Sequence, residues 1–552
     1  MSRAKIDHVV VLMLENRSFD HMLGFLDHPN PKFVRLGPSN DNDDGQGGRI
    51  VASDDAQATI VVGPGHEHGE VMRQLSPHGE LNNDGFVIDY DRLAASKGYA
   101  DVGYRIMQCQ HPNRIPVLAT LAKEFAVCTR WHCSVPGMTW PNRNFAHAAT
   151  SDGEVDIKHR PFDNPTIFEQ LSDEGKDWRV FSDNSALNAQ AKVFPKLWAS
   201  NGRNRFQGIN KFYRLASRNA LPHYSFIEPD HMWGFSSSQH PMNNVHSDHD
   251  FYAGEKLIAD IYAALTSNII TWQRSLFIIT YDEHGGFYDR MPPPQDAGYE
   301  VEETHGDGDD EFRFDLLGPR VPAVVVSPYI DQGTVDEEIH DHTSIISTVR
   351  ELLIPHTDPL NNREANIAHV ADLLTRTEPR DEVPELKPLE RADSLAFERM
   401  ARRMDDSVKD EMEMDEFQES LIWLSEYVES QLSGADASNA SASALERIDT
   451  AKSMEHRVPT PERLVILRTA EKSLEQPTES SINDHVTDDA AVEKVWLDDL
   501  SGNLLEWFPE GKLVFSYGEL ERGAMLDVQT AQRCFKLFCQ GELNSISEAM
   551  GG

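Results

Sequence analysis

A short apolar run followed at once by acidic residues is the feature that most constrains the fold of this chain. Residues 276–279 are bulky and apolar, and Asp282, Glu283 and His284 follow them, before Gly285 and Gly286. Such a run, bounded by polar residues and glycines, predicts a short buried strand. In open α/β sheets ligands bind beyond the carboxyl ends of the strands. The pattern therefore predicts a polar site at this strand end, although an acidic pair after a strand can also simply cap a helix.

The same pattern recurs along the first 360 residues. The apolar run 9–14 ends at Glu15 and Asn16, and further strands are predicted at 178–181, 224–227 and 321–326. Helical spacing is found at 115–126, from about 254, and from 341 to about 353. Alternating strands and helices predict an α/β fold with a central, mostly parallel sheet flanked by helices. No glycine-rich nucleotide-binding motif is present.

The length of 552 residues exceeds what one compact core usually holds, so several domains are expected. We predict a main domain over 1–379, a helical segment and linker over 380–444, and an accessory module over 445–552. The second part is highly charged, with Phe417, Leu421, Leu424 and Val428 at helical spacing, and ends in a Ser/Ala-rich stretch. Residues 495–497 and 513–515 predict a hairpin or small sheet in the module. This C-terminal region is expected to mediate self-assembly or to bind a protein partner.

Charge and cysteine content exclude several classes of function. The formal net charge of -40 argues against binding to nucleic acid or to anionic lipid. No apolar run is long enough for a signal peptide or a transmembrane segment. We therefore expect a cytoplasmic protein, or one exported by a route that needs no signal peptide. The five cysteines show neither a disulfide framework nor zinc-motif spacing, which favours buried or incidental thiols.

The polar residues at the strand ends suggest a metal-assisted reaction. Four residues offer oxygen ligands: Glu15, Asn16, Asp282 and Glu283. Oxygen ligands suit hard divalent cations, and the histidines nearby (His66, His246, His249 and His342) would extend the choice to zinc or iron. Thr139 begins a predicted helix, where its hydroxyl is either a helix cap or a group that meets an oxyanion. A metal beside a hydroxyl generates a nucleophile near neutral pH, which fits hydrolysis of a phosphate ester through a phosphothreonine.

Six segments in this chain, in the same order, resemble the phosphoesterase family that includes phosphatidylcholine-specific phospholipases C and a bacterial acid phosphatase. They are residues 7–21, 134–143, 226–229, 246–250, 281–289 and 341–344. The resemblance implies an alkaline-phosphatase-like fold and a divalent metal held by Glu15, Asn16, Thr139, Asp282 and Glu283. It also implies that Thr139 is the nucleophile and that Asn142, His66 and His246 contact the phosphoryl group. His249 and His284 complete the predicted substrate contacts. His246, Asp250 and His342 could instead hold a second metal.

Three functions remain open on sequence grounds. The first is a metal-dependent phospholipase C that cleaves phospholipid, phosphatidylcholine in particular, to diacylglycerol and a phosphorylated head group. The second is a phosphomonoesterase acting on small soluble phosphate esters, and the third is a scaffold with a degenerate site. Trp131, Trp140 and Trp233 lie near the motifs and are either a cradle for a choline-like cation or core residues. The sequence leaves the identity of the metal, whether zinc, calcium or another, undecided.

Overall fold

The computed structural model describes residues 6–389 apart from 57–59, 61, 159, 183–193, 195, 198–204, 230, 232–250 and 295–311. It also describes Ser420, Leu424 and four strands between 495 and 526. The chain divides into two compact units, one made of residues 1–231, 242–410 and 414–424, and the other of 232–241, 411–413 and 425–552. The predicted boundaries at 379 and 444 stay predictions.

An eight-stranded sheet forms the centre of the first unit. Its order is β10 (Thr334–Asp336), β4 (Ala126–Cys128), β9 (Ala323–Val326), β8 (Ser275–Tyr281), β1 (His8–Leu14), β7 (Tyr224–Glu228), β5 (Trp178–Ser182) and β6 (Phe206–Gly208). Only β9 in this sheet runs antiparallel to its neighbours. The predicted α/β class with a mostly parallel sheet is therefore confirmed.

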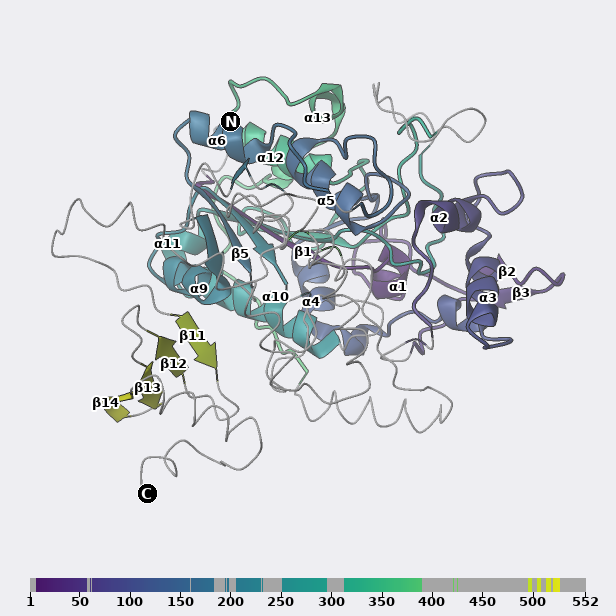
Figure 1. The fold of residues 1–552 in the computed structure, drawn as a ribbon, viewed down its shortest axis with the longest axis horizontal. Coiled ribbons are helices and arrows are strands. Elements are labelled where there is room, and N and C mark those ends of the chain that lie inside the picture. Colours follow the sequence, from purple (N-terminus) through teal and green to yellow (C-terminus); the bar gives the residue numbers. More distant parts are fainter. Residues whose placement is uncertain are drawn as a thin grey trace, which may run out of the picture. The chain divides into compact units, whose positions relative to one another are not determined.

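Helices cover both faces of the sheet (Figure 1). One face carries α5 (Thr139–Ala148), α6 (Ile167–Asp173) and α12 (Thr343–Leu353), which pack against one another. The other carries α4 (Pro116–Glu124), α9 (Ile209–Ser217) and α10 (Phe251–Thr266). Because both faces are covered, central strands such as β1 and β8 are buried along their whole length and consist mostly of apolar residues.

Shorter elements complete the first unit. The helices are α1 (Phe19–Leu23), α2 (His68–Leu75), α3 (Phe86–Ser96), α11 (Ile269–Trp272) and α13 (Asn362–Asn366), with 3-10 turns η1 (Gly103–Met107), η2 (Pro112–Arg114) and η6 (Val370–Leu373). A small hairpin pairs β2 (Asp41–Asp43) with β3 (Arg49–Val51). Among the described helices, none combines the length and apolar character that crossing a membrane requires.

The register of the two central strands positions the polar residues that follow them. Leu14 on β1 pairs with Tyr281 on β8, and the strands are parallel. The next residues, Glu15 and Asp282, therefore emerge side by side at the carboxyl edge of the sheet. The polar residues that follow these two predicted strands therefore lie at one edge of the sheet.

The second unit contains a four-stranded antiparallel sheet. Its strands are β11 (Val495–Asp498), β12 (Leu504–Trp507), β13 (Leu513–Tyr517) and β14 (Leu520–Leu526), paired in that order. The small sheet predicted here is confirmed, with β12 between the two strands that the sequence indicated. Of the four apolar residues that predict the amphipathic helix, only Leu424 is described, and it is buried. Phe417, Leu421 and Val428 lie outside the described residues.

Candidate functional site

Two of the predicted ligands, Glu15 and Asp282, are fully buried and paired with nitrogen donors. His231 Nδ1 donates to Glu15 Oε2 at 3.1 Å, and Arg143 Nε donates to Asp282 Oδ2 at 3.0 Å. Burial raises the pKa of Asp282 to about 7 in spite of the opposing effect of Arg143, with the charges of Glu15 and Glu283 adding to the rise. A cation beside these groups would therefore be favoured, since it would offset their mutual repulsion.

Glu283 differs from its neighbour Asp282, although both are completely buried. His66 Nδ1 donates to Glu283 Oε1 at 2.7 Å, and the backbone N–H of Gly285 donates to Oε2 at 2.6 Å. Burial alone would raise the pKa of Glu283, but His66 and His284 outweigh it and lower the pKa to about 2. Glu283 is therefore ionised across the physiological range, as a metal ligand must be.

Two glycines allow three loops to meet at this point. Gly285 has φ of 62°, and a Cβ there would lie 2.1 Å from the backbone oxygen of Asn16. Gly286 has φ of 72°, and its Cβ would lie 2.4 Å from the backbone oxygen of Gly65. Any larger residue would push away Asn16 or the loop that carries His66. The two glycines therefore permit the close backbone approach at this point.

Thr139 is the first residue of α5 and is buried, with 1% of its surface exposed. Its Oγ1 has no hydrogen-bond partner among the described residues. The preceding loop is held by Asn142, whose Oδ1 accepts from Val135 N and whose Nδ2 donates to the carbonyls of Val135, Gly137 and Met138. Asn142 thus fixes the loop that presents Thr139, while its predicted contact with a phosphoryl group stays a prediction.

Arg143 and His342 tie α5 and α12 to the end of β8. Arg143 follows Thr139 by four residues, so the two side chains share one face of α5, and Arg143 pairs with Asp282. His342 Nε2 donates to the backbone oxygen of Asp282 at 2.5 Å, and its Nδ1 accepts from Trp131 Nε1 at 3.3 Å. Burial lowers the pKa of His342 to about 4, so the ring is neutral at pH 7. In this arrangement both of its nitrogens are engaged within the protein.

The remaining predicted histidines divide into two groups. His284 is buried, donates from Nε2 to Gln74 Oε1 at 2.8 Å, and has its Nδ1 3.3 Å from Glu283 Oε2. It is therefore placed to support Glu283, and its predicted substrate contact stays a prediction. His246, His249 and Asp250 lie outside the described residues, so the second-metal hypothesis is untested.

The donor set fits a hard divalent cation. We call Glu15, Asn16, Thr139, Asp282 and Glu283 the oxygen cluster, since each offers oxygen. Two of these oxygens, Asn16 Oδ1 and Thr139 Oγ1, are buried without a hydrogen-bond partner among the described residues. A cation would satisfy both, because a buried polar atom left unpaired costs free energy. In the described arrangement the three carboxylates do not converge within 4.8 Å of one another, and each pairs instead with Arg143 or a histidine.

Sequence reasoning did not assign roles to three residues that shape this site: Arg143, His231 and Gln74. The spacing of Arg143 from Thr139, four residues along one helix, was a usable signal. His231 and Gln74 carry no comparable pattern, because their contacts depend on tertiary structure.

Trp131 is buried and bonded to His342, and Trp140 is buried and donates to Ser420 Oγ at 2.6 Å. Both are therefore core residues, and Trp233 lies outside the described part of the chain.

Comparisons with known proteins agree on one family. The sequence model of the Phosphoesterase family matches residues 6–353. Non-specific phospholipase C3 of Arabidopsis thaliana is 31% identical over 423 residues, covering 70% of this chain and 77% of that protein. Non-specific phospholipase C4 of the same plant is 31% identical, covering 76% and 79%. Non-hemolytic phospholipase C of Burkholderia pseudomallei is 28% identical, covering 62% and 54%.

Proposed function

This chain belongs to the Phosphoesterase family and is a phosphoric ester hydrolase, and we propose that it is a metal-dependent phospholipase C. Its substrate would be a phospholipid, phosphatidylcholine in particular, and its products diacylglycerol and a phosphorylated head group. Relatives named phospholipase C support the substrate class. The predicted phosphomonoesterase activity and the scaffold role become outcomes of the test below.

The observation that carries the proposal is the position of Thr139. Its hydroxyl is buried at the N-terminus of α5 and has no hydrogen-bond partner among the described residues. Arg143, on the same helix, donates to Asp282 and so connects α5 to the end of β8. A helix N-terminus favours a negatively charged phosphoryl group. A hydroxyl at that position is therefore suited to attack phosphorus.

In the first half of the reaction, Thr139 loses its hydroxyl proton to solvent, Oγ1 bonds to phosphorus, and the bond from phosphorus to the glycerol oxygen breaks. A divalent cation held by the oxygen cluster would lower the pKa of the hydroxyl and neutralise charge on the phosphoryl oxygens. The departing glycerol oxygen needs a proton. His66 is the best-placed donor that the structure describes, since it contacts Glu283 and keeps 21% of its side chain exposed.

In the second half, water attacks the phosphothreonine and the bond between Thr139 Oγ1 and phosphorus breaks. This step releases the phosphorylated head group, and Thr139 Oγ1 takes up a proton from solvent to regenerate the hydroxyl. His66, having given up its proton, accepts one from the attacking water. Glu283 keeps the imidazole oriented through the bond to Nδ1 in both halves.

The direct test compares two substrates with one preparation of the full-length protein. Phosphatidylcholine vesicles and p-nitrophenyl phosphate are offered after treatment with chelator and after adding back magnesium, calcium or zinc singly. We expect release of diacylglycerol and phosphocholine to be lost on chelation and restored by at least one cation. Cleavage of the aryl phosphate with intact lipid would instead identify a phosphomonoesterase. No turnover with any metal would support the scaffold.

A further inference from the structure

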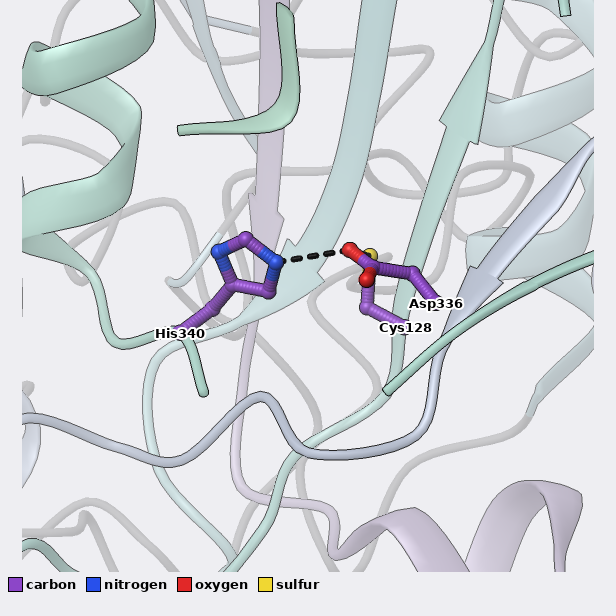
Figure 2. A group of neighbouring side chains, drawn as sticks. All are labelled: Cys128, Asp336 and His340. Carbon is purple, nitrogen blue, oxygen red and sulfur yellow. Dashed lines mark hydrogen bonds and ion pairs between the residues drawn. The ribbon is translucent and has the colours of Figure 1, made fainter. Parts of the chain in front are cut away.

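A second group of metal-ligating side chains lies at the same edge of the sheet, where β4 and β10 end. Cys128 and Asp336 are register partners in this parallel pair, and His340 follows Asp336 by four residues. Figure 2 shows the His340 ring directed at the Asp336 carboxylate, with the Cys128 sulfur beside it. His340 Nε2 lies 2.7 Å from Asp336 Oδ2, and Cys128 Sγ lies 3.6 Å from the same oxygen. We call these three residues the thiol cluster.

The thiol cluster is shielded from solvent. Cys128 is fully buried, and His340 and Asp336 are 1% and 8% exposed. The sulfur, imidazole nitrogen and carboxylate oxygen all lie within 4.8 Å of one another. Within the described residues, no other set of three histidine, cysteine or acidic side chains brings its ligand atoms so close. Three buried ligand atoms at this spacing fill three positions of a tetrahedral metal site.

The hydrogen bonds of His340 hold its ring in place. Nδ1 lies 3.2 Å from the backbone oxygen of Ala368 and 3.2 Å from the hydroxyl oxygen of Ser344, so it can donate to the carbonyl or accept from the hydroxyl. When Nδ1 donates to Ala368, a neutral ring presents the Nε2 lone pair to Asp336 Oδ2 at 2.7 Å, and a cation can lie between the two atoms. Histidines that bind metals have their other nitrogen fixed in the same way.

We propose that Cys128, Asp336 and His340 bind a zinc-type divalent cation at a site separate from the oxygen cluster. Thiolate and imidazole select zinc, cobalt and similar ions, whereas magnesium and calcium prefer oxygen alone. In a tetrahedral zinc site with bonds of about 2.3 Å to sulfur and about 2.0 Å to oxygen, sulfur and oxygen are separated by roughly 3.5 Å. The observed 3.6 Å between Sγ and Oδ2 matches this value. The distance from Nε2 to Oδ2 must widen by about 0.6 Å, and water supplies the fourth ligand.

Metal binding here exchanges a proton for the cation. Burial raises the pKa of the Cys128 thiol, so the metal-free protein carries Cys128 as the S–H form, which donates to Asp336. Binding breaks the S–H bond, forms the bond from sulfur to metal, and releases the proton to solvent. No redox partner is needed.

The site would brace a chain of contacts that ends at the oxygen cluster. Trp131 stacks on the His340 ring, with centroids 5.3 Å apart and planes at 27°. Its Nε1 donates to His342, and His342 in turn donates to the backbone oxygen of Asp282. A metal that fixes His340 therefore also restrains the residues that support Asp282.

Cobalt spectroscopy on the full-length protein tests the proposal independently of phosphoesterase activity. A bond between thiolate and Co²⁺ gives an intense near-ultraviolet charge-transfer band that oxygen and nitrogen ligands do not give. We expect chelator-treated wild-type protein to develop this band when Co²⁺ is added. The intensity of the band should reach its maximum when one equivalent of Co²⁺ is bound to sulfur, and the band should disappear when excess zinc is added. Cys128→Ser should abolish the band, whereas Cys109→Ser, which alters a buried thiol outside the cluster, should retain it.

Three results would overturn the proposal. The first is a wild-type protein that gives no charge-transfer band with Co²⁺. The second is a band that persists in folded Cys128→Ser. The third is a band that is lost in Cys133→Ser but not in Cys128→Ser. Such a band would belong to the oxygen cluster, because the charges of Glu283 and Asp282 act on the Cys133 thiol and raise its pKa beyond the effect of burial. If circular dichroism shows that Cys128→Ser does not fold, the experiment uses His340→Gln instead. A Co²⁺ spectrum of His340→Gln identical to that of the wild-type protein would reject the site.

Discussion

The oxygen cluster and the thiol cluster occupy equivalent positions in the sheet but offer different ligand atoms to a metal. Each lies where two parallel strands end together, β1 with β8 and β4 with β10. At the first position glutamate and aspartate follow the strands, and at the second cysteine and aspartate are the last strand residues. Because the sheet topology is shared, the difference in chemistry comes from the side chains alone. One cluster suits a hard cation and the other a thiophilic one.

Exposure separates the two clusters further. The residues of the oxygen cluster are buried, but His66, which contacts Glu283, keeps 21% of its side chain exposed and can meet a substrate. The thiol cluster is enclosed, and its nearest aromatic neighbour, Trp131, connects it to the other site. A parallel sheet thus brings polar residues together at one edge, and access from solvent decides whether these residues take part in catalysis or stabilise the structure.

Among these variants, Thr139→Ala should have the largest effect on activity, and it should affect the oxygen cluster but not the thiol cluster. We expect turnover of ester substrate to fall at least about 10³-fold, since the nucleophile is lost. The cobalt–thiolate band should be unchanged. Thr139→Ser, which keeps a hydroxyl at the same place, should retain measurable turnover. An alanine variant that works at the wild-type rate would exclude a phosphothreonine intermediate.

Arg143→Met tests whether the oxygen cluster depends on its buried ion pair. Removing one partner of a buried pair leaves Asp282 uncompensated, so the free energy of unfolding should fall by about 3–5 kcal/mol. Urea denaturation measures this loss. The matched control is Arg160→Met, whose pair with Asp152 is 37% and 47% exposed and should contribute less than about 1 kcal/mol. Equal losses in both variants would mean that burial does not strengthen the Arg143 pair.

The sequence predicted the oxygen cluster better than the thiol cluster, for a physical reason. Continuous apolar runs such as 9–14 and 276–279 can be recognised as strands from the sequence, and acidic residues after them indicate a site. By contrast β4 and β10 have three residues each, with no extended apolar run. Cys128 and Asp336 are 208 residues apart, and only the sheet order makes them neighbours. Cysteine spacing along the chain therefore gave no indication of a metal site.

Other features also depended on tertiary structure. The apolar run 321–326 predicted a strand, but nothing in it showed that β9 would run antiparallel to β4 and β8. His342 was expected near phosphate or metal, whereas both of its nitrogens bond within the protein. Which lone pair a histidine presents is set by the neighbours it meets after folding.

Gly285→Ala should disturb the oxygen cluster through Asn16. A methyl group at 285 would meet the Asn16 backbone oxygen, and φ of 62° is itself unfavourable for alanine. Gly175→Ala is the matched control, because it has φ of 68° and nothing within 4 Å of the new methyl. Unfolding experiments should show a loss of roughly 1 kcal/mol for Gly175→Ala from φ alone. We expect a larger loss for Gly285→Ala.

The same pair of variants separates catalysis from stability. A displacement of about 1 Å at a reacting group can cost about 10²-fold in rate, so Gly285→Ala should lower turnover well beyond Gly175→Ala. The cobalt–thiolate band should be the same in both. If the two variants are equally active, the close approach of the loop to Asn16 is not needed for catalysis.

His147 provides a contrast with His340. Both imidazoles are buried, but His340 faces a carboxylate, whereas neither ring nitrogen of His147 has a hydrogen-bond partner among the described residues. His147 packs against Phe168 and Phe226. Burial, with the charge of Arg143 adding to it, lowers the pKa of His147 to about 3.

The sign of the resulting pH dependence follows from proton binding. Between pH 6.5 and about 3 the unfolded chain binds a proton at His147 that the folded chain excludes. The stability linked to this residue is therefore complete above pH 6.5 and is lost as the pH falls towards 3. In His147→Leu, the slope of unfolding free energy against pH over that interval should decrease by up to about 1.4 kcal/mol per pH unit. Urea denaturation of both proteins between pH 7 and pH 4 measures it, and identical slopes would show that His147 becomes protonated within the folded protein.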